Sequence, residues 1–427
     1  MNILILGATG LIGTSIANKL VDDGHEVSGL SRSTASAAGK MPHVRWITAD
    51  LSDMAASSDW EEVLAGQQVV VNCAGALQDG LSDDLAATQE RAMLALYEAA
   101  RNRGLQLIVQ ISAETDGAGR ESAFLVTKRK ADTALVASGV PHVIIRPALV
   151  LARNAHGGSA LLRALAALPW VIPLAYAENP VATVAVEDVA ATVSEAVCGI
   201  LPVGSDLALA SGESLTLRDL VLLHRRWLGL PPARVMVLPS TLARPVAWIA
   251  DIAGKLGWRS PLRSTAMEII SGGITTRHVQ ECDIPVSSAA EILAASPSGV
   301  QDLWFARLYL LKPFIILTLS LFWLISGLVP FLAFEAARNH FAAFLPGPLA
   351  SIITVTTSLA DIVLGLALLF RPWARRALIG MLCLTLVYLF AATVNEPMLW
   401  FDPLGSLVKV LPSLLLTLAA LAILEER

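Results

Sequence analysis

Charged residues are scarce in this chain of 427 residues, where they make up only 16% against 55% hydrophobic residues. A soluble domain usually carries about 25% charged residues, and here the apolar excess is concentrated after residue 310. There is also no excess of positive charge, because the formal net charge is −5. Without a basic surface, the sequence gives no reason to expect a nucleic-acid partner.

Cysteine and histidine are few and scattered. The four cysteines form no CxxC pair, which indicates a reducing compartment without a structural metal. His278 and Cys282 are four residues apart, but a metal site needs three or four ligands. We therefore predict no metal. The N-terminus also lacks the basic region of a signal peptide and begins with a strand-like run.

Short apolar runs alternate with helix-like segments over the first 150 residues. This alternation predicts the α/β Rossmann class, a doubly wound parallel sheet with helices on both faces. The expected strands are 2–6, 26–30, 44–47, 69–72, 107–111 and 143–146, and the expected helices are 11–21, 83–103 and 124–138.

Beyond residue 150 helical patterns dominate, at 157–168, 186–198 and 216–227, and strands are few. We expect these segments to form a small lobe over the sheet. The chain then divides into a sheet domain with its lobe (1–285), a connector (286–310) and a membrane domain (311–427).

The loop after the first predicted strand is rich in glycine and opens a helix. Its residues are Gly7, Ala8, Thr9, Gly10, Leu11, Ile12 and Gly13. The first glycine permits a tight turn, the second lets a pyrophosphate approach the backbone, and the third lets helix and strand pack closely. The free N–H groups and the dipole of the helix favour phosphate. The context predicts a dinucleotide site.

The end of the second predicted strand bears on the choice of dinucleotide. An NAD site usually has an acidic residue there for the ribose 2′-OH, but this chain has Ser31 and Arg32. A guanidinium can bind a 2′-phosphate through two hydrogen bonds. We therefore favour NADP(H) over NAD(H), the alternative being that Arg32 is only a solvated surface residue.

Further motifs follow the glycine loop in a fixed order: Ala49-Asp50-Leu51, Asn72-Cys-Ala-Gly75, Ile111-Ser112-Ala113, Thr127-Lys128, Arg146-Pro147 and Val186-Glu-Asp-Val-Ala190. Over roughly residues 1–280 this order resembles the extended and atypical short-chain dehydrogenases/reductases. It looks closest to the branch that includes the NADPH-binding accessory subunit of respiratory complex I. The resemblance implies that Asp50 and Leu51 border the adenine, that Ala74 and Gly75 pass along the cofactor ribose, and that the nicotinamide is approached by Arg146, Pro147 and Ala148.

The resemblance also implies a catalytic group of Ser, Tyr and Lys. Ser112 fits the serine position and Lys128 the lysine position, but Phe124 stands where the family has its acid–base Tyr. A phenyl ring cannot exchange a proton, and general acid–base catalysis is typically worth about 10²–10⁴ in rate. Lys128 can still hold the nicotinamide ribose hydroxyls. The alternative interpretations are that Lys128 is an ordinary surface lysine and that Ser112 is only a turn residue at the end of a strand.

The last quarter of the sequence contains four apolar segments of about 20 residues, the length that spans a bilayer. They cover about 313–334, 349–370, 374–394 and 404–424. Six basic residues lie on one side of these spans, namely Arg307, Lys312, Arg371, Arg375, Arg376 and Arg427, and only Arg338 lies on the other. The positive-inside rule then places both termini and the sheet domain in the cytoplasm, at a bacterial-type inner membrane.

The four-helix segment resembles the DoxX-like membrane domain. The residues that carry the likeness are Gln301-Asp302 and Arg307-Leu-Tyr before the first span, and Trp400, Asp402-Pro403, Lys409 and Pro412 near the end. Asp361 and Lys409 are charges within the spans, where a charge usually faces a partner or a cavity. No histidine lies in a span, so we expect no haem.

Two classes of function remain open. The first is a membrane-bound NADP(H)-dependent oxidoreductase or isomerase that acts on a small lipophilic, quinone-like substrate. The second is a non-catalytic module that binds NADP(H) as a structural ligand or redox sensor and engages a membrane protein partner. Membrane attachment and the glycine loop favour the enzyme, whereas Phe124 counts against it.

Overall fold

The computed structural model describes all residues except 76, 82–83, 118, 276–283, 404 and 426–427. It divides into two compact units. The first comprises Met1–Gly254 and Arg259–Ala306, and the second comprises Lys255–Trp258 and Arg307–Arg427.

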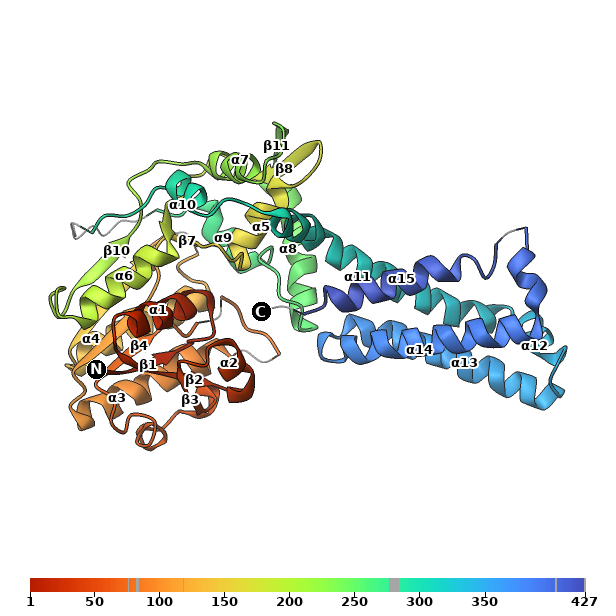
Figure 1. Ribbon diagram of the computed structural model, residues 1–427, viewed down its shortest axis with the longest axis horizontal. Helices are drawn as coiled ribbons and strands as arrows, with labels where there is room; N and C mark the ends of the chain where they lie inside the picture. Colours follow the sequence, from red (N-terminus) through yellow and green to blue (C-terminus); the bar gives the residue numbers. More distant parts are fainter. Residues whose placement is uncertain (76, 82–83, 118, 276–283, 404, 426–427) are drawn as a thin grey trace. The chain divides into compact units, whose positions relative to one another are not determined.

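The first unit is built on a parallel sheet of seven strands in the order β10-β6-β5-β4-β1-β2-β3 (Figure 1). The strands are β1 (Asn2–Leu6), β2 (Glu26–Ser31), β3 (Arg45–Thr48), β4 (Val69–Asn72), β5 (Leu107–Ile111), β6 (His142–Pro147) and β10 (Asp206–Leu209). The central strands β1, β4 and β5 consist mainly of Val, Ile and Leu because helices bury both faces of the sheet, although β5 also contains the buried Gln110. The predicted Rossmann class is confirmed.

Helices cover the two faces of this sheet and form two separate cores. One core packs α1 (Leu11–Asp22) and α6 (Val186–Val197) against the sheet. The other contains α3 (Ala92–Arg103) and α4 (Ala123–Ser138), together with the fully buried Trp60. A π-helical turn, Ala86–Arg91, precedes α3, and α2 (Thr34–Lys40) follows β2.

The small lobe contains more strands than the sequence suggested. It has β7 (Leu149–Leu151) paired with β9 (Thr183–Ala185), and β8 (Val171–Ala175) paired with β11 (Arg234–Leu238). Its helices are α5 (Gly157–Ala166), α7 (Leu217–Trp227), α8 (Ser240–Lys255), α9 (Ser264–Ser271) and α10 (Ala289–Ala295). Strands of three to five residues are too short to show an alternating pattern, so the sequence did not reveal them.

The second unit is helical. It contains most of α11 (Val300–Leu332), followed by α12 (Phe334–Ala342), α13 (Gly347–Leu369), α14 (Arg371–Asn395), the 3₁₀ turn Pro397–Phe401 and α15 (Val410–Ala422). Within the described residues, three helices, α11, α13 and α14, are long and apolar enough to cross a membrane. This agrees with the predicted membrane domain.

The fourth expected span, 404–424, differs from the prediction in length. Its helix, α15, has only 13 residues, and Lys409 takes its N-cap position. Gly405, with φ +68°, and Pro403 lie in the segment before it, where neither residue type favours a helix. The expected connector, 286–310, contains α10 and the first turns of α11.

Candidate functional site

The glycine loop lies where the strand order of the sheet reverses. The loop leaves β1, which has β2 on one side and β4 on the other. In open α/β sheets, ligands bind at such a switch point, outside the carboxyl ends of the strands.

Three glycines shape this loop, each for a different reason. Gly7 has φ +73°, and a Cβ there would lie 2.9 Å from the backbone N of Ala74. Gly10 donates its N–H to the Gly7 carbonyl over 3.0 Å and caps α1 without a side-chain hydrogen bond. A Cβ on Gly13 would lie 2.2 Å from the Gly7 carbonyl oxygen. The first turn of α1 therefore presents uncapped N–H groups beside a backbone that excludes side chains, which fits a dinucleotide pyrophosphate.

Lys128 lies beneath the same edge of the sheet. It is buried on α4, and its Nζ donates to the carbonyl oxygens of Ile111 at 2.9 Å and Ala74 at 3.4 Å. Ile111 is the last residue of β5 and Ala74 lies two residues after β4, so the lysine bridges the chain at the ends of two neighbouring strands. Burial lowers the pKa of its ammonium group. The alternative interpretation, a surface lysine, does not fit this position.

Ser112 is tied to an acidic residue that the sequence did not single out. Its Oγ donates to Oδ2 of Asp132 over 2.5 Å. Arg146 contacts the same carboxylate oxygen at 2.9 Å and also pairs with Asp206 at 2.7 Å. The guanidinium further donates to the carbonyl of Ala113 at 2.7 Å. Arg146 thus joins α4, β10 and the end of β5.

Asp132 could have been noticed, because it follows Lys128 by four residues on a predicted helix. Its significance comes from burial, which raises the pKa of its carboxyl group against the opposing effect of Arg146. Its Oδ1 atom is buried and has no hydrogen-bond partner among the described residues. With Lys128, Arg146 and Asp206 ionised, an ionised Asp132 makes this cluster neutral overall.

Cys73 lies beside this cluster, directly after β4. Burial raises the pKa of its thiol to about 12, so the residue stays a neutral thiol near pH 7. It is not a nucleophile under ordinary conditions.

The predicted adenine and ribose residues lie after β2 and β3. Ser31 accepts a hydrogen bond at its Oγ from the Ser33 N–H over 3.2 Å, and Arg32 is exposed at the end of β2. Asp50 accepts from the Ser52 N–H at 3.0 Å and from the Ser52 hydroxyl at 2.8 Å, which caps a 3₁₀ turn, Leu51–Asp53. These strands end at the same edge of the sheet as β1.

Phe124 lies in the first turn of α4, one turn before Lys128, and is partly buried. Tyr97 cannot replace the missing hydroxyl, because it is buried in the core that α3 and α4 share and donates to Oε1 of Gln110 over 3.4 Å. Burial raises the pKa of its phenol further. The described site therefore holds Ser112 and Lys128 without a tyrosine.

Within the second unit, Asp361 on α13 is buried and is held by two hydroxyl groups. Ser326 of α11 donates to Oδ2 over 2.8 Å, and Tyr388 of α14 donates to Oδ1 over 2.9 Å. Both carboxylate oxygens are therefore occupied by hydroxyls and not by Lys409, which is exposed. The triad links three membrane helices.

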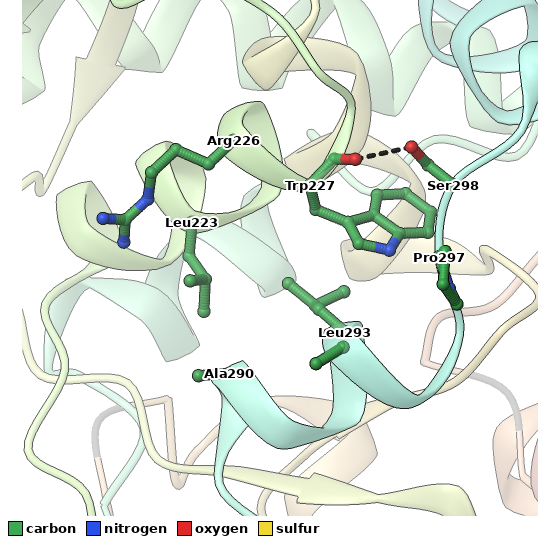
Figure 2. A pocket seen from close by; sticks show the side chains of 8 residues that line it. Leu223, Arg226, Trp227, Ala290, Leu293, Pro297 and Ser298 are labelled. Carbon is green, nitrogen blue, oxygen red and sulfur yellow. Dashed lines mark hydrogen bonds between the residues drawn. The ribbon is translucent and has the colours of Figure 1, made fainter.

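A shallow groove lies in the small lobe, between α7 and the segment that contains α10 (Figure 2). Ser298 donates to the carbonyl of Trp227 at one end of it, and its lining is otherwise mostly apolar. No group of three or more potential metal ligands occurs in the described part of the chain. His278 and Cys282 lie outside the described residues.

Comparison with known families matches both units. Residues 7–197 match the NAD(P)H-binding family, and residues 320–418 match the DoxX-like family. Comparison with curated proteins gives no match.

Among solved structures, the chain is similar to Pal from Bacillus thuringiensis, with 16% identity and a TM-score of 0.52 over 71% of this chain and 100% of that one. It is also similar to UDP-glucuronic acid 4-epimerase from Bacillus cereus in complex with UDP-glucuronic acid and NAD, with 16% identity and a TM-score of 0.50 over 72% of this chain and 100% of that one. At this identity the likeness shows the fold alone.

Proposed function

We propose that this chain, which joins an NAD(P)H-binding domain to a DoxX-like membrane domain, is a membrane-bound NADP(H)-dependent oxidoreductase or isomerase with a small lipophilic, quinone-like substrate. The observation that carries the proposal is the uncapped start of α1 at the switch point, with Lys128 buried under the same edge.

The residues present fit a dinucleotide. Gly7 and Gly13 leave no room for side chains beside the first turn of α1, so backbone N–H groups are available to the pyrophosphate. Lys128 would hold the nicotinamide ribose hydroxyls, and Arg32 would contact a 2′-phosphate. When bound, the reduced nicotinamide supplies a hydride.

Membrane attachment supports a lipophilic substrate. The second unit holds helices that can cross a bilayer, and a domain tethered to a membrane meets substrates dissolved in it. The polar triad around Asp361 offers hydrogen-bonding groups within the apolar bundle.

Reduction of a carbonyl also requires a proton at the substrate oxygen. Phe124 cannot provide it, so the proton comes from solvent or from the Ser112 hydroxyl, which Asp132 holds. The wild-type enzyme should therefore be slow on generic ketones.

The test is NADPH oxidation by purified membranes, with and without a quinone. Phe124→Tyr places a hydroxyl one turn before Lys128 and should raise carbonyl reduction by up to about 10²–10⁴. Adding Lys128→Ala should abolish that gain, whereas Lys130→Ala, on the exposed side of α4, should not. A fast wild type that tolerates both Ser112→Ala and Lys128→Ala would contradict this assignment of the site.

A second candidate is a non-catalytic NADP(H)-binding module of a membrane complex. Two observations favour it: Phe124 lacks a hydroxyl, and Ser112 directs its own hydroxyl inward to Asp132. This module would bind NADPH tightly, show no turnover with any quinone or ketone, and co-purify with a membrane protein partner.

We further propose that the cofactor domain and both termini face the cytoplasm of a bacterial-type inner membrane. The basic residues beside the spans support this orientation. A reporter that is active only outside the cytoplasm should be active when fused after Leu345 and silent when fused after Arg376. The reverse pattern would overturn the orientation.

A further inference from the structure

Helix α8 (Ser240–Lys255) turns its large apolar side chains outward. Trp248 is 66% exposed and Ile249 is 62% exposed. Together with three further exposed side chains they form what we call the apolar face of α8: Leu242, Val246, Trp248, Ile249 and Ile252. A surface helix of a soluble domain normally turns such residues inward.

The side of α8 that faces the protein carries only small residues. Ala243, Ala247, Ala250 and Gly254 recur at helical spacing and are buried. The helix therefore packs closely on the lobe through its small residues while the larger ones remain uncovered. Figure 1 shows α8 as a long helix after β11. An uncovered apolar face made of five large side chains indicates a binding surface.

The polar edge of α8 is basic. Arg244 and Lys255 lie along one side of the helix, next to Trp248, and both are exposed. Asp251, on the same side, is paired with Arg263 at 3.1 Å. An apolar face with tryptophan beside a cationic edge is typical of helices that lie in a membrane interface.

The chain that follows α8 explains why the partner is a bilayer. Residues Lys255–Trp258 belong to the membrane unit. Leu256 accepts a backbone hydrogen bond from Arg371 over 3.0 Å, and the Trp258 indole donates to the carbonyl of Leu369 over 2.7 Å. Leu369 ends α13 and Arg371 begins α14, so this segment is fixed at the end of two membrane helices.

The surface of the bilayer lies at the ends of its spanning helices, and Gly254 is the residue directly before this fixed segment. Because the chain continues directly from Gly254 into this segment, only a few residues separate the end of α8 from the part of the chain that lies at the lipid headgroups. An apolar face can bind either lipid or protein, and this connection brings the face of α8 to lipid.

We propose that α8 lies in the plane of the membrane interface, with its apolar face in the lipid and with Arg244 and Lys255 toward the phosphates. Interfacial helices of this kind bury their apolar face by about 5–10 Å. This contact would attach the cofactor domain to the bilayer at a second place besides α11. The inference does not depend on the reaction catalysed.

The test uses the full chain in lipid nanodiscs and a nitroxide label at Ile249→Cys. Cys198, Cys282 and Cys383 are first changed to serine, while Cys73, which is partly buried and whose thiol has a raised pKa, is retained. The matched control is Val136→Cys, which is 56% exposed on α4 of the same unit. We expect the Ile249 label to be accessible to oxygen, shielded from an aqueous nickel complex, and at a depth of about 5–10 Å. The control label should be accessible to nickel.

Three results would overturn the proposal. An Ile249 label as accessible to nickel as the control would mean that the face is in water. A label shielded from both reagents would mean that protein covers it. Dipolar coupling between labels of two chains would identify a second copy as the partner. The exposed label sites leave the core unchanged, and NADPH binding provides a check on folding that is separate from the lipid readout.

Discussion

Gly13→Ala is the most direct test of the cofactor loop. A Cβ at this position would lie 2.2 Å from the Gly7 carbonyl oxygen and 2.9 Å from the Ala8 Cα. Both neighbours are backbone atoms, so no side chain can turn away to make room. The loop must open by about 0.8 Å to reach 3.0 Å, the practical lower limit for such a contact.

This movement displaces the atom that organises the loop. The Gly7 carbonyl accepts the Gly10 N–H at 3.0 Å, and this turn places the N–H groups at the start of α1. Overpacking of this kind costs about 1–3 kcal/mol of stability. The loss of one charge-assisted hydrogen bond to phosphate is worth about 1.5–3 kcal/mol, which corresponds to roughly 10–100-fold in the dissociation constant for NADPH.

The control is Gly39→Ala in α2, where a Cβ would meet no atom within 4 Å. That change should stabilise the protein by about 0.4–1 kcal/mol and leave NADPH affinity unchanged. Calorimetric titration and thermal unfolding of the purified full chain measure both effects. If Gly13→Ala bound NADPH as tightly as Gly39→Ala, the close approach of helix and strand would not control the site.

Three further changes test other parts of the molecule. Arg32→Ala should weaken NADPH binding by roughly tenfold or more and NADH binding very little. Equal losses of affinity for the two dinucleotides by calorimetry, or the same effect from Arg45→Ala on β3, would refute the argument that Arg32 contacts the ribose 2′-phosphate. Burial lowers the pKa of His224 to about 4. The neutral imidazole therefore contributes its full stability above about pH 6.5, and this contribution is lost as the pH falls through 4. His224→Gln should consequently reduce the fall in thermal midpoint between pH 7 and pH 5. Asp361→Leu removes two interhelical hydrogen bonds worth about 0.6–2 kcal/mol each and should lower the midpoint in detergent more than Thr356→Ala, whose exposed hydroxyl donates only within its own helix.

The sequence predicted the sheet well because the strands that are buried on both faces are mostly apolar. The runs at β1, β4 and β5 are of this kind, and each matches its predicted range within a residue. β10 (Asp206–Leu209), at one edge of the same sheet, was missed, whereas β3, an edge strand of equal length, was predicted. The role of β10 emerges only when Asp206 pairs with Arg146, 60 residues earlier.

The candidate site was predictable where a local motif defines it. Gly7, Gly10 and Gly13 occupy the turn and helix start that their spacing indicates. The sequence could single out Asp132 by its spacing from Lys128, but not its contact with Ser112 and Arg146, because these three residues come from separate elements that only the folded sheet brings together. The outward apolar face of α8 was equally hidden, since periodicity shows an apolar stripe but not which side the protein covers.

The α4 residues 124, 128 and 132 follow one another at intervals of one turn, and their order bears on the chemistry of the site. The first has lost the hydroxyl that the resembled family uses, the second remains buried at the strand ends, and the third adds a carboxyl group that holds Ser112. The groups on this helix that can exchange a proton are therefore Lys128 and Asp132, one and two turns after Phe124. Burial raises the pKa of the Asp132 carboxyl group, and the ion pair with Arg146 opposes that effect.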